Sequence, residues 1–139
     1  AEEGREMIES GVMEIQSHTY DLHQWADYEE SGTARDTVLR IDGESESDYM
    51  TMMNEDCARE RETIETGMGG TVHAISYPHG DYDDLAAVMM SENGFDISFT
   101  VNKGINVLIK GIDQSMLALK RNNTDTQTTD EQLLTSVSR

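Results

Sequence analysis

The sequence predicts an α/β fold with mainly parallel strands. Apolar residues recur at helical spacing in several segments, and short runs of alternating apolar and polar residues separate these segments. Helices and strands therefore follow one another along the chain, without an internal repeat. Such alternation is typical of parallel βαβ units, so we expect one domain over residues 1–139.

The first half of the chain is predicted to contain two helices and one strand. A helix at about 2–10 ends at Gly11, and an alternating run at about 12–17 predicts a strand. Residues 24–46 are polar and interrupted by glycine, which indicates a long loop. A second helix begins near Ser47 and ends at the glycines of 67–70. The lone cysteine, Cys57, lies on its apolar stripe, so we expect it to be buried.

The second half repeats this alternation with weaker signals toward its end. Strands are predicted at 71–77, 96–101 and 117–121, and a helix at about 82–92. The acidic pair Asp83-Asp84 opens that helix, where carboxylates favour the helix N-terminus, so we expect a capping role rather than a catalytic one. A capping-type start at Thr129 predicts a terminal helix.

The charge of the chain limits its partners. The formal net charge is −18, from 28 acidic and 10 basic residues. Like charge repels, so nucleic acid and anionic membrane surfaces are disfavoured, whereas a neutral or cationic glycan is tolerated. No apolar run is long enough to span a membrane, and no signal-peptide pattern opens the sequence. We therefore expect no nucleic-acid partner and no membrane insertion.

Two histidines, His18 and His23, directly follow the strand predicted at 12–17. Imidazole nitrogen suits zinc, nickel and cobalt, and an open site needs a third protein ligand, commonly a carboxylate. The same spacing also occurs between unrelated surface histidines. The pair alone therefore leaves two interpretations open, a metal site and an incidental one.

Further landmarks accompany the histidine pair in a fixed order. They are Glu14 to His23, the Tyr-Pro-His-Gly turn at 77–80, and the Gly-Phe-Asp-Ile-Ser-Phe-Thr run at 94–100. Together they resemble the NodB-homology polysaccharide deacetylases (carbohydrate esterase family four), and within them the branch that acts on poly-N-acetylglucosamine. The resemblance covers about residues 3–121. It implies an incomplete irregular (β/α) barrel that removes N-acetyl groups from a cell-surface or cell-wall polysaccharide with a divalent metal, in the cell envelope or outside the cell.

The resemblance also implies roles for individual residues. His18 and His23 become ligands of a divalent cation, expected to be zinc, with cobalt and nickel as alternatives. The loop of Tyr77, Pro78, His79 and Gly80 becomes substrate-binding, and a backbone N–H there helps to stabilise the oxyanion. His79 stands where the family usually has tyrosine and takes the catalytic position. Trp25 is a further substrate-binding candidate, because its ring can stack on a sugar; the alternative is that it packs the loop down.

Two motifs of the family are absent. No Thr-Phe-Asp-Asp run precedes His18, although this run supplies the metal-binding aspartate and the catalytic base in the family. The late Leu-x-x-His motif has no match either. We expect the missing strand to lie upstream of Ala1, and metal binding and activity to be weak.

Two other interpretations stay open. The chain could be a non-catalytic carbohydrate-binding or assembly protein that keeps the deacetylase fold, or an acidic α/β domain with an incidental histidine pair. An uncovered strand edge also predicts a homodimer.

Overall fold

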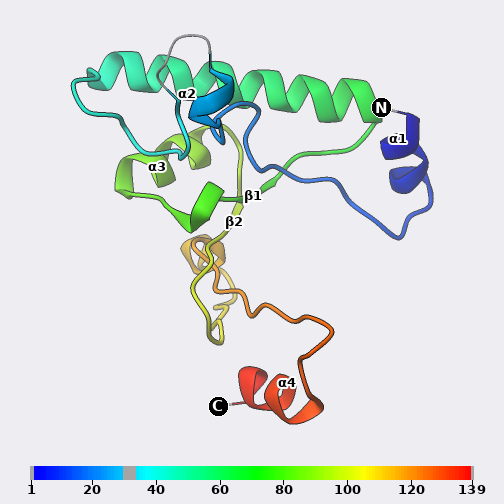
Figure 1. Ribbon diagram of the computed structural model, residues 1–139. Coiled ribbons are helices and arrows are strands. Elements are labelled where there is room, and N and C mark those ends of the chain that lie inside the picture. The colour runs from blue at the N-terminus through cyan, green and yellow to red at the C-terminus, as the bar shows by residue number, and fades with distance from the viewer. Residues whose placement is uncertain (1, 30–33, 139) are drawn as a thin grey trace.

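The computed structural model describes residues 2–29 and 34–138. Residues 30–33 of the predicted loop at 24–46, and both terminal residues, lie outside this range. Figure 1 shows α2 running across the top of the molecule, with α3 and the two strands beneath it and α4 at the opposite end. The elements in chain order are α1 (Glu2–Glu9), α2 (Glu46–Arg61), β1 (Ala74–Ser76), α3 (Asp84–Glu92), β2 (Ile97–Phe99) and α4 (Asp130–Val137).

Helix α2 provides the largest apolar face. The Ser45 side chain caps it by accepting the Asp48 N–H, and a π-helical turn at Glu62–Thr66 extends it toward the glycines at 67–70. Its buried stripe contacts the core residues of β1 and α3. Cys57 lies in this stripe, and burial raises the pKa of its thiol to about 12. Its predicted place in the core is confirmed.

The capping predictions for the two later helices are also confirmed. The Asp83 carboxylate accepts the Ala86 N–H at 2.8 Å and caps α3. Thr129 and Gln132 form a capping box at the start of α4. Asp83 is thereby occupied with a structural hydrogen bond.

The two strands pair in parallel, which confirms the predicted α/β class with a parallel sheet. Ala74 lies opposite Ile97, and Ser76 lies opposite Phe99. Single parallel bridges add one segment on each side, from Ser17 to Ile75 and from Phe99 to Leu119. The four predicted strand segments are therefore neighbours, but only the central two form regular strands.

The predicted strand at 12–17 is reduced to one bridge because a side chain does most of its pairing. The Gln16 amide oxygen accepts the N–H groups of His73 and Ala74, each at 3.0 Å, and its nitrogen donates to the Thr71 carbonyl. Val12 and Met13 are exposed rather than alternately buried. The prediction of a strand over 12–17 was wrong in extent, although the segment lies where a strand would.

The predicted strand at 117–121 is interrupted at Ala118. This residue has a positive φ of 55°, and its N–H donates to the Ser98 hydroxyl instead of to a strand partner. A left-handed residue ends extended pairing. Leu119 forms the single bridge to β2, through bonds to Ser98 and Thr100, and the Arg121 N–H donates to the Asn102 carbonyl beyond it.

Among the described residues, no helix has both the length and the apolar character needed to cross a membrane.

Candidate functional site

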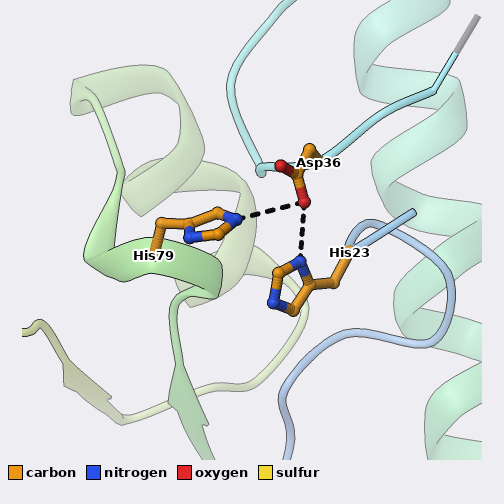
Figure 2. Close-up of side chains that lie close together, drawn as sticks. All are labelled: His23, Asp36 and His79. Atoms are coloured by element: carbon orange, nitrogen blue, oxygen red, sulfur yellow. Dashed lines mark hydrogen bonds and ion pairs between the residues drawn. The ribbon is translucent and has the colours of Figure 1, made fainter. Parts of the chain in front are cut away.

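Three loops meet at the carboxyl end of β1. The bridge at Ser17 runs parallel to β1, so the chain leaves both segments at the same edge of the sheet. The first of these loops carries His18 and His23. The second is the turn at Pro78–Gly80, which carries His79. Figure 2 shows that Asp36, from a third loop, lies between His23 and His79.

Asp36 binds both histidines through one oxygen. Its Oδ1 lies 2.7 Å from His23 Nδ1 and 3.1 Å from His79 Nε2 (Figure 2). The rings of His23 and His79 are nearly perpendicular, with centroids 4.5 Å apart. Hydrogen bonds from His23 and His79 lower the pKa of Asp36. An ionised carboxylate can only accept, so both ring nitrogens that face it carry a hydrogen.

His18 is held in a similar way by a backbone carbonyl. Its Nδ1 lies 2.5 Å from the Ser76 oxygen, and its ring centroid lies 5.4 Å from that of His23. A carbonyl can only accept, so His18 Nδ1 carries the hydrogen. In a neutral ring the other nitrogen, Nε2, then has a free lone pair.

The same reasoning gives His23 a free lone pair on Nε2. The two predicted metal ligands, His18 and His23, lie next to each other. In each, the Nδ1 hydrogen is donated to a protein acceptor. Histidine ligands of metals commonly donate their second ring nitrogen to a carbonyl or a carboxylate. The donor set of this chain therefore fits a divalent cation.

A second grouping of possible ligand atoms includes Asp36. One atom from each of His23, Asp36 and His79 lies within 4.8 Å of the other two. His18 is outside this grouping. The structure thus brings all three predicted histidines to one edge of the sheet and adds Asp36 to them.

Two buried carboxylates of α2 hold the loop that carries His18. Glu60 accepts the Ser17 hydroxyl at 2.6 Å and the His18 N–H at 3.2 Å. Asp56, one turn earlier, accepts the N–H groups of Tyr20 and Asp21. Burial raises the pKa of both carboxyl groups. These supports were not predicted from the sequence, although acidic residues at helical spacing within an apolar stripe could have identified them.

Only some side chains of the predicted substrate-binding turn are exposed to solvent. Tyr77 is buried and stacks on Tyr82, with ring centroids 5.1 Å apart, and Pro78 is also buried. His79 is exposed and has a left-handed φ of 55°. Within this turn, His79 and the backbone of Gly80 are the parts nearest to solvent.

Trp25 lies beside the histidines. A shallow cavity of about 300 Å³ is lined by Trp25, His23, Asp36, His79 and small neighbours. Trp25 is 69% exposed, so its ring is accessible to a ligand. Trp25 therefore shares one surface with the histidine cluster.

Asp36 was not predicted from the sequence. It lies in a polar segment without periodicity, 13 residues after His23. Its neighbour Arg35 exchanges hydrogen bonds with Gln24: Gln24 N–H donates to the Arg35 carbonyl, and Arg35 N–H donates to the Gln24 side chain. No local sequence pattern predicts the pairing of Gln24 with Arg35. It is a tertiary contact that forms only when the chain folds.

The chain belongs to the polysaccharide deacetylase family. The sequence model of the family described as Polysaccharide deacetylase matches residues 1–98. A search of curated proteins finds no match.

Several solved structures share the fold. A de-N-acetylase from Aggregatibacter actinomycetemcomitans is 23% identical, with a TM-score of 0.75, over 98% of this chain and 52% of that chain. The BpsB deacetylase domain from Bordetella bronchiseptica is 26% identical, with a TM-score of 0.57, over 72% and 40% of the two chains. IcaB from Ammonifex degensii is 26% identical, with a TM-score of 0.56, over 73% and 39%. This chain spans about half the length of the first of these proteins.

Proposed function

We propose that this chain supplies the histidine ligands of a metal-dependent polysaccharide de-N-acetylase. The observation that carries the proposal is the arrangement of His18 and His23, with both Nδ1 atoms hydrogen-bonded and both Nε2 atoms left as ligands. Family membership and the deacetylases that share the fold support the reaction class. The proposal includes an irregular (β/α) barrel, an N-acetylated glycan as substrate, and action in the cell envelope or outside the cell.

The metal in this proposal is zinc, with cobalt and nickel as alternatives. When bound, such an ion polarises the acetamide carbonyl and lowers the pKa of water. His18 and His23 would hold it. Glu60 and Asp56 hold the loop that carries His18 by accepting hydrogen bonds from its backbone N–H groups.

The other residues of the surface bind and orient the glycan in this proposal. Trp25 offers an exposed ring that can stack on a pyranose. The backbone N–H of His79 has no acceptor among the described residues, and we assign it to the carbonyl oxygen of the acetyl group. The catalytic role of position 79 thus rests on its backbone, which a change from tyrosine to histidine preserves.

The experiment is zinc binding by calorimetry. Wild type should bind zinc, and the double variant His18→Ala, His23→Ala should lose this binding. His73→Ala is the matched control, because His73 precedes β1, at the end of the strand away from the turn of His79, and its ring contacts Gln16. Unchanged zinc binding in the double variant would refute the proposed ligands.

Catalysis and glycan binding are measured separately. We expect little or no acetate release from acetylated chito-oligosaccharides, because no Thr-Phe-Asp-Asp motif provides a base, and general-base catalysis is worth about 10²–10⁴-fold. Robust, metal-dependent acetate release would contradict this expectation. Trp25 is the single tryptophan, so its fluorescence reports on glycan binding. Glycan binding by a chain that binds no zinc would favour the non-catalytic carbohydrate-binding function instead.

A further inference from the structure

Asp36 is the point at which three separate segments meet. Its Oδ1 accepts from His23 Nδ1 at 2.7 Å and from His79 Nε2 at 3.1 Å (Figure 2). The carboxylate is half exposed, and its position therefore depends on the chain that carries it.

That chain is fixed directly beside His23. Gln24 follows His23, Arg35 precedes Asp36, and these two residues exchange two hydrogen bonds, at 2.9 Å and 2.7 Å. The Arg35 guanidinium is buried against Glu44 and the Leu39 carbonyl. Asp36 and His23 are thus held together by their neighbours, independently of their own contact.

The contact determines which nitrogen of His23 can bind a metal. A neutral imidazole carries one hydrogen, and Asp36 engages it at Nδ1. Nε2 then keeps its lone pair, as in His18, whose Nδ1 hydrogen is engaged by Ser76. Without an acceptor at Nδ1, the ring would divide between two tautomers and rotate more freely.

We infer that Asp36 is a positioning residue, which fixes the tautomer and orientation of the metal ligand His23 and joins His79 to it through the same oxygen. The inference rests on the proposed function for the identity of the ligand. It assigns His79 a place in the outer shell of the metal site, in addition to its place in the substrate turn. Removing an outer-shell partner of this kind typically weakens metal binding by roughly 10- to 100-fold.

A different arrangement would place the ion directly among His23 Nδ1, Asp36 and His79 Nε2, whose atoms lie within 4.8 Å of one another. This would require both nitrogens to lose the hydrogens that now point at Asp36. It would also leave His18 without a role. The two arrangements predict opposite results for variants of His18 and His79.

The first measurement uses the metal-free protein. Nitrogen-15 NMR of the histidine rings should show His23 with its hydrogen on Nδ1 in wild type. In Asp36→Ala the ring should show a mixture of tautomers. A His23 ring with its hydrogen on Nε2 in wild type would overturn the inference, whatever the protein binds.

The second measurement is zinc affinity by calorimetry on the whole chain. Asp36→Ala should bind zinc roughly 10- to 100-fold more weakly. Asp36→Asn should bind it less weakly than Asp36→Ala, because its amide oxygen still accepts hydrogen bonds, although without the negative charge. Asp27→Ala removes the same charge from an exposed position nearby and should change the affinity less than twofold, by our estimate for a screened surface charge. Circular dichroism checks that each variant is folded.

The outcomes separate the inference from the proposed function. Equal zinc affinities for wild type and Asp36→Ala would overturn the inference and leave His18 and His23 as ligands. Loss of zinc binding in His79→Ala, with normal binding in His18→Ala, would place the ion at Asp36 and overturn it as well. Normal binding in the His18, His23 double variant would refute the proposed function, while the tautomer of His23 would still test Asp36.

Discussion

Gly80 allows the turn that carries His79 to pass close to the end of β2. Its φ is +80°, and an added Cβ would lie 2.6 Å from Val101 Cγ2 and 2.7 Å from Val101 N. The backbone nitrogen cannot move aside as a flexible side chain can. Gly80 therefore meets two separate requirements, a left-handed conformation and open space.

Gly80→Ala should destabilise the protein more than a conformational penalty explains. Gly43→Ala is the matched control, because Gly43 has a φ of +82° and nothing within 4 Å of the added Cβ. Both variants pay about 1–2 kcal/mol for a left-handed alanine. The steric contact should make Gly80→Ala worse by at least about 1 kcal/mol in urea denaturation. Equal losses would contradict the close approach of Val101.

The site residues divide into those with a sequence signal and those without one. His18, His23 and His79 lie in ordered landmarks, so their common location at one sheet edge could be predicted. Asp36 could not, because its partners are 13 and 43 residues away in sequence and no periodicity links them. Long-range pairing of loops leaves no local pattern.

At the scale of elements, α2 links the core to the ligand loop. Asp56 is buried, and its two oxygens accept the N–H groups of Tyr20 and Asp21, at 3.0 Å and 2.7 Å. Burial raises the pKa of Asp56, while these hydrogen bonds oppose the rise. The net rise means that the folded protein binds a proton at Asp56 more tightly than the unfolded chain does.

This rise gives Asp56 a definite pH dependence. Its contribution to stability is full below the unfolded pKa of about 3.9 and is lost as the pH rises through the higher folded pKa. The unfolding free energy of wild type, relative to that of Asp56→Asn, should therefore fall as the pH rises above about 4. Urea denaturation across this range measures it. A relative unfolding free energy of wild type that rises with pH would contradict the raised pKa of Asp56.

The observed helices agreed with the sequence-based predictions more closely than the observed strands did. Caps at Asp83 and Thr129 and the apolar stripe of α2 are local features, and each appeared where expected. The outer strand segments depended on tertiary contacts instead. Gln16 and Ala118 replaced backbone pairing by hydrogen bonds that no alternation of apolar and polar residues encodes.

At the scale of the whole molecule, the segment that leads into the Ser17 bridge lies at one edge of the sheet. Val12 is 85% exposed, and Met13 is exposed as well. Exposed strand-like edges favour pairing with another chain. The homodimer expected from the sequence stays a prediction, with this edge as its interface.

Sedimentation velocity tests the dimer. Wild type should show a concentration-dependent dimer, and Val12→Lys should shift it to monomer, because a charge on the edge opposes pairing. Val107→Lys changes another exposed valine and should leave the dimer intact, because the neighbouring Asn106 bonds to Lys120, next to the Leu119 bridge on the opposite edge of the sheet. A monomer at all concentrations would contradict the prediction, as would equal shifts in both variants.

The side chain of Gln16 has a consequence for folding fidelity. Successive residues of an extended segment point to opposite faces, so a slip by one position would exchange the directions of Ser17 and His18. Short edge segments slip easily, since few backbone bonds hold them. Here one amide engages three backbone groups of residues 71–74 at once, and a shifted alignment would have to break all of them. Gln16, two residues before the first histidine, thus fixes the strand register on which the site depends.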